Sequence, residues 1–190
     1  MTTRNNGAPT SSEPSTSSPN WPRPNRRNAP GVFREDRIRR PDGSTGIYGV
    51  VEKPDFALVL PRWAEGFWLV EQFRYPVGRR AWEFPQGSWG HGVTGGASAL
   101  ARQELAEETG LRAETVTHLG HLYEAYGFST QGFDVYLATG LTEGEPDREA
   151  TEQDMVHRPL TDAQVRAMVL AGEIVDAPSL AALTLYTISR

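Results

Sequence analysis

Two stretches of the chain decide the fold: Glu83-Phe84-Pro85-Gln86-Gly87 and, after a glycine-rich loop, Ala101-Arg102-Gln103-Glu104-Leu105-Ala106-Glu107-Glu108-Thr109-Gly110-Leu111. The second stretch falls in a predicted helix from Ala97 to Thr109, which ends at Gly110 because glycine readily adopts the left-handed conformation of a helix terminus. The spacing of Glu104, Glu107 and Glu108 predicts three carboxylates that converge on one helix face. Like charges at this spacing repel, and Mg²⁺, a hard cation that takes oxygen ligands, would relieve the repulsion. An isolated Glu-x-x-Glu-Glu is more often merely solvated. Only the surrounding sequence can distinguish a metal site from solvated glutamates.

Apolar runs on both sides of this segment predict a central sheet. Residues 56–60 and 67–70 are continuously apolar, which is typical of strands buried on both faces. Further strands are expected at 115–123 and at 133–138, where apolar and polar residues alternate. A turn at Pro41-Asp42-Gly43 predicts a hairpin ahead of them.

Two more helices complete the predicted fold. One opens on Thr161-Asp162-Ala163-Gln164, a capping-box pattern, and stops near Gly172. The other runs from about Pro178 to Ile188 and is apolar enough to be largely buried. We therefore expect an α/β fold, a mixed β-sheet sandwiched between α-helices in an α/β/α arrangement, with an N-terminal β-strand arm.

The composition changes sharply near residue 30. Residues 1–30 are rich in Ser, Pro and Asn and are expected to form a disordered tail. Residues 31–190 are expected to form a single domain, and its first part, residues 31–54, holds the N-terminal strands.

The charge balance and the amino-acid usage exclude several classes of partner. Lys and Arg number 19 against 24 Asp and Glu, a net charge of −5, so nothing overall attracts a nucleic acid or an anionic membrane. The chain has no cysteine, which excludes disulfides, thiolate nucleophiles and Cys-ligated metals and suits a reducing compartment. No stretch approaches the roughly 20 apolar residues of a membrane span. We expect a soluble, cytoplasmic protein, and its four histidines show no metal-ligand spacing.

With its surroundings, the glutamate-rich helix resembles the Nudix box, Gly-x5-Glu-x7-Arg-Glu-U-x-Glu-Glu-x-Gly-U, in which U is apolar. The second half of the box is matched at Glu104, Leu105, Glu107, Glu108, Gly110 and Leu111. The resemblance covers roughly residues 34–188 and points to the ADP-ribose pyrophosphatase group within the superfamily. It is carried by four further segments, at residues 71–76, 82–87, 126–129 and 172–183.

The chain departs from the box at two positions. The box arginine, which helps to orient a catalytic carboxylate in the family, falls on Gln103, and Arg102 lies one position earlier. The first box glutamate falls on Gly95, and the spacing from Gly87 to Glu104 is two residues longer than the pattern. Glutamine can donate a hydrogen bond but carries no charge. We expect the metal site to persist despite these replacements.

The resemblance implies Mg²⁺-dependent hydrolysis of the pyrophosphate bond in a nucleoside diphosphate derivative, with ADP-ribose cleaved to AMP and ribose 5-phosphate, and with Mn²⁺ as a substitute metal. Two alternatives stay open. One is the same reaction on another nucleoside diphosphate sugar or on a dinucleotide such as NADH, and the other is a Nudix-fold module that senses nucleotides without hydrolysing them. The resemblance also implies a homodimer formed through the N-terminal strands.

The metal and catalytic residues follow from the same resemblance. Glu104 and Glu108 would be the main metal ligands, Glu107 a supporting one, and the backbone carbonyl of Gln86 a further oxygen. Glu104 and Glu107 would also take part in catalysis. The general base would come from the loop before the penultimate strand, whose candidates are Glu149, Glu152 and Asp154, and the downstream Pro159-Leu160 favours Glu152.

The residues expected to bind the substrate lie ahead of the box. Arg74 is predicted to bind the phosphates, because a guanidinium group offers a charged, bidentate fork. Arg79 is a weaker candidate, as is Arg80, and both could simply decorate a turn. Glu83 is predicted to contact the substrate ribose or a metal-bound water, with a structural salt bridge as an equal alternative. The aromatic rings that could stack on a purine are those of Tyr48, Trp63 and Trp82.

Overall fold

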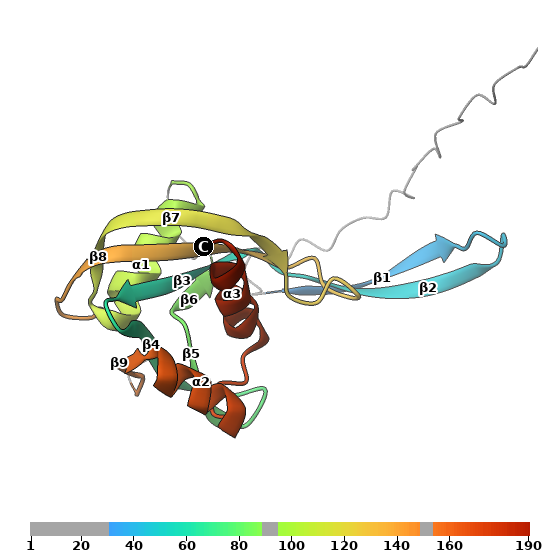
Figure 1. Cartoon of the computed structure of the whole chain (residues 1–190). Coiled ribbons are helices and arrows are strands. Elements are labelled where there is room, and N and C mark those ends of the chain that lie inside the picture. The colour runs from blue at the N-terminus through green and yellow to red at the C-terminus, as the bar shows by residue number, and fades with distance from the viewer. Residues whose placement is uncertain (1–30, 89–94, 149–153) are drawn as a thin grey trace, which may run out of the picture.

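The computed structural model describes residues 31–88, 95–148 and 154–190, and its centre is a seven-stranded mixed sheet (Figure 1). Five strands follow in the order β5-β4-β3-β8-β7, while β6 pairs with β3 and β9 pairs with β4. Strands β3 and β8 run parallel, and the other pairs are antiparallel. The strand bounds are β3 Phe56–Trp63, β4 Gly66–Arg74, β5 Arg79–Glu83, β6 Gln86–Ser88, β7 Arg112–Tyr123, β8 Gly132–Thr142 and β9 Val156–Thr161.

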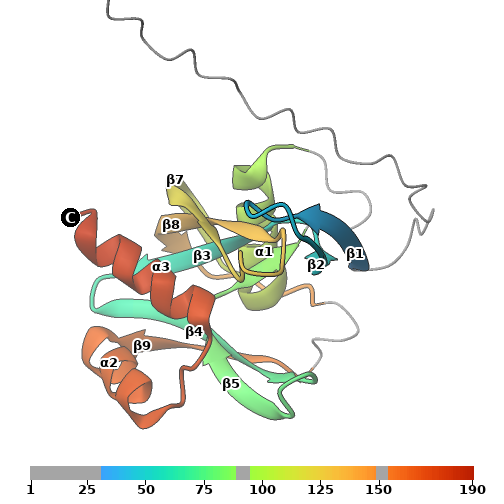
Figure 2. The same ribbon diagram turned by 90° about the vertical axis from the view of Figure 1, so that its right-hand side faces the viewer.

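Three helices cover the two faces of this sheet (Figure 2). α1 (Ala97–Thr109) packs on one face, over Ala57 and Val59 of β3. α2 (Asp162–Ala171) and α3 (Ala177–Ile188) cover the other face, where the remaining buried residues of β3 lie. Because β3 buries both of its faces, its continuously apolar sequence is explained, and the predicted α/β/α sandwich is confirmed.

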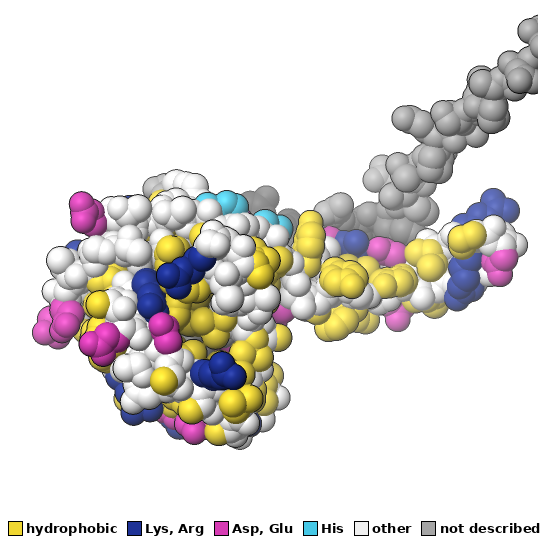
Figure 3. Space-filling view, viewed as in Figure 1, with side chains coloured by type: hydrophobic (Ala, Val, Ile, Leu, Met, Phe, Trp, Pro, Cys, Tyr) yellow, Lys and Arg dark blue, Asp and Glu magenta, His cyan; other side chains and the backbone are white. Residues whose placement is uncertain are grey.

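The first two strands form a separate two-stranded arm that extends away from the body (Figure 1). β1 (Val32–Arg39) pairs antiparallel with β2 (Thr45–Glu52). The base of the arm is joined to the loop after β7, since the Val51 amide donates to the Phe128 carbonyl over 2.8 Å and the Thr130 amide donates to the Val51 carbonyl over 3.0 Å. Figure 3 shows hydrophobic side chains along the arm and basic ones at its far end.

The helix ends follow the residues that predicted them. α1 ends at Gly110 in the left-handed conformation, with φ of 75°. The capping box at the start of α2 is complete, because Thr161 and Gln164 bond to each other's backbone amides. The Asp176 side chain caps α3 by accepting from the Ser179 amide over 2.8 Å. In the part of the chain that the structure describes, no helix is long and apolar enough to cross a bilayer.

Sequence patterns did not reveal three strands, β5, β6 and β9. β5 begins with Arg79 and Arg80, for which the sequence allows a turn as well as a substrate-binding role, and β9 contains a proline. Both strands pair with β4, so a neighbour distant in sequence determines them. The loop that carries the candidate bases therefore precedes the last strand, not the penultimate one. The predicted disordered tail, residues 1–30, lies outside the described residues.

Candidate active site

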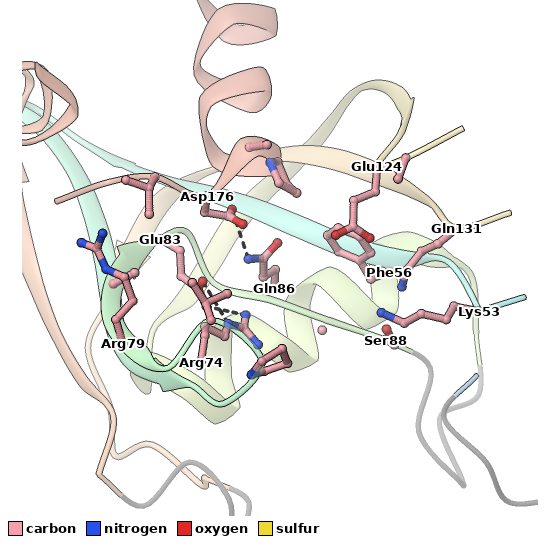
Figure 4. A pocket seen from close by; sticks show the side chains of 18 residues that line it. Lys53, Phe56, Arg74, Arg79, Glu83, Gln86, Ser88, Glu124, Gln131 and Asp176 are labelled. Atoms are coloured by element: carbon pink, nitrogen blue, oxygen red, sulfur yellow. Dashed lines mark hydrogen bonds and ion pairs between the residues drawn. The ribbon is translucent and has the colours of Figure 1, made fainter. Parts of the chain in front are cut away.

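A cavity of about 730 Å³ opens where β4, β5 and β6 meet the start of α3 (Figure 4). Arg79 lies at one end of it, and Lys53 and Gln131 lie at the other. The volume suits a small organic ligand. The predicted site residues that line it are Arg74, Arg79, Glu83 and Gln86.

Arg74 and Glu83 form a bidentate ion pair in the wall of this cavity. Arg74 Nη2 lies 2.5 Å from Glu83 Oε1, and Arg74 Nε lies 3.1 Å from Oε2. The side chain of Gln72 adds a third hydrogen bond to Glu83, over 2.7 Å. The β4–β5 register puts Gln72, Arg74 and Glu83 on one face of the hairpin, because Glu83 is opposite Val70 and side chains two and four positions along β4 point the same way. The structural salt bridge that the sequence left open for Glu83 is thus present.

The electrostatics of the pair keep Arg74 charged. Burial lowers the pKa of Arg74, but the charges of Glu83, Glu108 and Asp176 and the bonds to Glu83 outweigh this and raise it. Burial raises the pKa of Glu83, and the pairing with Arg74 opposes that rise. Glu83 is almost fully buried, whereas the Arg74 side chain is 40% exposed. Arg74 can therefore meet a ligand in the cavity, and Glu83 acts by holding Arg74.

Glu104 lies directly against the second wall of the cavity, at β6. A Cβ added to Gly87 would overlap the Glu104 carboxylate, so glycine leaves room for the carboxylate in its present position. β6 is held in place by two contacts of the residues before it, since the Val59 amide donates to the Pro85 carbonyl over 2.9 Å and the Phe84 amide donates to Ser179 Oγ over 3.0 Å. The glycine that follows Gln86 therefore positions a predicted metal ligand.

The three box carboxylates do not form a ready-made cluster. Glu107 accepts a hydrogen bond from Gln103 Nε2 over 2.9 Å, while Glu108 is almost fully buried. Within the described residues, no three acidic or histidine side chains are close enough together to hold a metal ion. Glu104 and Glu108 lie one helical turn apart on one row of α1, and Glu107 shares the neighbouring row with Gln103.

The structure shows the contacts and backbone conformation of the residues at the altered box positions. Arg102 does not substitute for the missing arginine, because it donates to the Ala113 carbonyl over 2.6 Å, on β7. Gln103 bonds to Glu107 without supplying a charge. Gly95 has φ of 124°, which strains any other residue, so a glutamate could not occupy this position in the present backbone.

The structure leaves the general base open. Glu149 and Glu152 lie outside the described residues. Asp154, the third candidate, is engaged by Arg80, whose Nη1 lies 2.5 Å from Asp154 Oδ2 and whose Nε lies 2.8 Å from Glu71 Oε2. Arg80 thereby fixes the start of the segment that leads into β9.

The remaining predicted contacts turn out differently. Arg79 donates to the Gly172 carbonyl over 3.0 Å, at the end of α2, and still lines the cavity. Trp82 packs against the core with Arg158 over its ring. The candidate stacking residues Tyr48, Trp63 and Trp82 are not among the described residues that line the cavity.

Sequence reasoning missed the residues that reach the cavity from other elements. Asp176 accepts a hydrogen bond from Gln86 Nε2 over 3.3 Å, and Gln131 is buried beside Lys53 at the far end. Among described residues, neither Gln86 nor Gln131 has a hydrogen-bond donor for its buried side-chain oxygen. A helix-capping aspartate carries a sequence signal, but a lone glutamine on a loop carries none.

Comparisons with known proteins show the family of this chain. The NUDIX domain family matches residues 53–176, which include the whole box. The chain therefore belongs to the Nudix family and is a Nudix hydrolase.

Particular relatives narrow the class further. The ADP-ribose pyrophosphatase of Mycobacterium tuberculosis (strain ATCC 25618 / H37Rv) is 38% identical over 153 residues, which are 79% of this chain and 73% of that protein. The ADP-ribose pyrophosphatase of Bacillus subtilis (strain 168) is 32% identical over 148 residues, 77% of this chain and 78% of that one. A crystal structure of an ADP compounds hydrolase shares the fold, with a TM-score of 0.72 at 17% identity over 83% of this chain and 84% of the other.

Proposed function

We propose that this protein hydrolyses the pyrophosphate bond of ADP-ribose to AMP and ribose 5-phosphate with the help of Mg²⁺, for which Mn²⁺ can substitute. The observation that carries the proposal is the cavity itself, which has a charged arginine in one wall and the box glutamate Glu104 at the other. The similarity to two ADP-ribose pyrophosphatases supports the choice of substrate.

The residues present fit a hard divalent cation. Glu104 and Glu108 are one helical turn apart, and Glu104 is held against the backbone of Gly87. We infer that these two carboxylates hold the metal, with Glu107 in support and the carbonyl of Gln86 as a further oxygen. When bound, Mg²⁺ neutralises the phosphate oxygens and lowers the pKa of a bound water.

The substrate side of the reaction depends on charge and on hydrogen-bond donors. Arg74, oriented by Glu83, would bind the phosphates through the part of its guanidinium that faces the cavity. Arg79 would add a second positive charge at the cavity end. The side-chain oxygens of Gln86 and Gln131 would accept hydrogen bonds from sugar hydroxyls, which a ribose supplies in number. Glu152 would take the proton from the attacking water.

Product formation from ADP-ribose tests this function. With Mg²⁺ present, the wild type should release AMP and ribose 5-phosphate, and Glu108→Gln should lose more than the roughly 100-fold that outer-shell changes cost. Glu114→Gln is the matched control, because it removes the same charge from the exposed surface of β7. Faster turnover of another nucleoside diphosphate sugar or of NADH would change the substrate. Tight nucleotide binding without any turnover would contradict the proposal and indicate a sensor.

We also infer that the protein works as a homodimer built on the arm. Phe33 and Ile47 on the arm are 68% and 65% exposed, although both are large and apolar. An isolated two-stranded hairpin is marginally stable in water, so the arm needs a partner surface. A second copy of the chain supplies one, and the junction of β2 with residues 128–130 would place it near the cavity end at Gln131.

Light scattering tests the dimer. The wild type should have twice the mass of the chain, and the double substitution Phe33→Asp and Ile47→Asp should give monomers. The double substitution Glu35→Gln and Arg37→Gln, on the same face of β1, is the control that should remain dimeric. A monomeric wild type at working concentration would remove this part of the proposal.

The domain boundaries and the compartment belong to the same proposal. Residues 31–190 would form the hydrolase domain and residues 1–30 a tail without a dedicated site. A chain free of cysteine and with an acidic net charge suits the cytoplasm, with a small nucleotide as its ligand and neither nucleic acid nor membrane as a partner.

A further inference from the structure

The last turn of α1 carries two box glutamates but no basic residue of its own. The carbonyl groups at a helix C-terminus bear partial negative charge, and a nearby cation stabilises them. The resemblance implies that a box arginine helps to orient a catalytic carboxylate on this helix, and here Gln103 stands at its position. The turn that holds Glu107 and Glu108 thus needs support from elsewhere in the fold.

That support comes from the segment after β8. The backbone amide of Asp147 donates to the Glu107 carbonyl over 3.0 Å, and Arg148 Nε donates to the Glu108 carbonyl over 3.0 Å. Both carbonyls are therefore bonded by two consecutive residues of one segment. Gly110, just beyond the helix, lies so close to Gly144 that a Cβ on Gly110 would overlap the Gly144 carbonyl. The segment packs tightly along the helix end.

Arg148 also connects this helix end to β9, on the same face of the sheet as α1. Its Nη2 lies 2.6 Å from His157 Nδ1 on β9, and the His157 ring packs on Trp68 with ring centroids 5.8 Å apart. A neutral histidine accepts this bond when its other nitrogen carries the proton. Because β9 pairs with β4, Arg148 is anchored to the strand that ends at Arg74. The guanidinium of Arg148 is thus fixed at both of its ends.

We propose that Arg148 takes the place of the arginine missing from the box: it is a positioning residue that fixes the last turn of α1 and so orients the carboxylates of Glu107 and Glu108 toward the metal. Arg148 brings its charge to the Glu108 carbonyl from the segment after β8, whereas a box arginine would lie within the helix. The kinetic part of the test rests on the proposed function, because it uses ADP-ribose as the substrate. The metal-binding part does not, because it measures the Mn²⁺ affinity of the substrate-free protein.

The test compares Arg148→Met with Arg102→Met. Both substitutions remove an arginine that donates to backbone carbonyls near α1, but Arg102 bonds to β7, away from the carboxylates. Mn²⁺ affinity of the substrate-free protein is measured by electron paramagnetic resonance, and kcat and KM are measured with ADP-ribose. Arg148→Met should weaken Mn²⁺ binding and lower kcat by about 10- to 100-fold with KM nearly unchanged, as is typical for residues that orient metal ligands. Arg102→Met should change neither.

Rescue makes the test specific. Adding Gln103→Arg to Arg148→Met should restore much of the Mn²⁺ affinity, because the charge returns to the box position, whereas a merely structural defect would persist. Equal Mn²⁺ affinity in Arg148→Met and Arg102→Met, or no recovery with Gln103→Arg, would overturn the proposal. If Arg148→Met does not fold, Arg148→Lys with and without Gln103→Arg carries the same comparison. A wild type that binds Mn²⁺ but leaves ADP-ribose intact would refute the proposed function alone.

Discussion

The two ends of α1 are built in opposite ways. At its start, the N-cap is Gly96, which offers no side chain, and the first turn has no acidic residue. At its end, Thr109 Oγ1 bonds to the Leu105 carbonyl over 2.5 Å and accepts from the Leu111 amide over 3.1 Å, and residues 144–148 close over the last carbonyls. The tightly bonded end carries Glu107 and Glu108, the proposed metal ligands, which would need a rigid support. The departure from the box at Gly95 falls at the loosely bonded end, far along the helix from Glu107 and Glu108.

Gly110→Ala should break the tightly bonded end and have the largest effect on stability. The left-handed conformation costs a residue with a Cβ roughly 1–2 kcal/mol, and the overlap with the Gly144 carbonyl adds to it. Gly172→Ala is the matched control, because Gly172 has φ of 71° and nothing within 4 Å of an added Cβ. Urea unfolding of both variants separates the two contributions. Equal losses of stability in the two variants would mean that the overlap with the Gly144 carbonyl adds no cost.

The same comparison shows what the sequence could predict. Both boundaries of α1 were predicted from local signals in the sequence. Gly110 adopts a left-handed backbone at the helix end, and the glutamates recur at helical spacing. The burial of β3 on both faces was likewise predicted from its continuously apolar sequence. These features depend on residues close together in sequence.

Features that depend on distant residues were not predictable. The pairing of Arg74 with Glu83 depends on the register of a five-residue strand that begins with two arginines, a pattern with little strand signal. The role of Arg148 depends on a contact across forty positions, and no spacing rule covers it. The motif thus predicted a candidate site, whereas the contacts that hold its residues in place became visible only in the tertiary structure.

A lower pH should reduce the stability by less than Gly110→Ala does, and it tests the Arg148 contact at the tightly bonded end of α1. Burial and, second, the charge of Arg148 lower the pKa of His157 below 6.5, while Glu143 opposes the shift. The unfolded chain therefore binds this proton more readily than the folded one. The stabilising contribution is complete above pH 6.5 and is lost as the pH falls through the lowered value in the folded state. His157→Gln keeps an acceptor for Arg148 and does not titrate.

Chemical denaturation over a pH series checks this effect. The free energy of unfolding of the wild type should decrease more steeply below pH 6.5 than that of His157→Gln. His118→Gln, which removes an exposed histidine of β7, is the control. Parallel curves for the wild type and His157→Gln would show that the Arg148 contact does not respond to protonation.

Gly96→Ser should give the smallest change, and in the stabilising direction. A serine at the N-cap can accept a hydrogen bond from a backbone amide of the first turn. Relative to glycine, this stabilises the helix by roughly a few tenths of a kcal/mol. Gly96 has an extended backbone with φ of −83° and open space around an added Cβ, so the replacement meets no obstacle. Thermal unfolding should show a slightly higher Tm with unchanged kcat, because Glu104 lies against Gly87 and the turn of Glu108 is bonded at the other end of the helix. A change in kcat with this variant would show that the start of α1 also controls the carboxylates, and the contrast between the two ends would no longer explain why the altered box is tolerated.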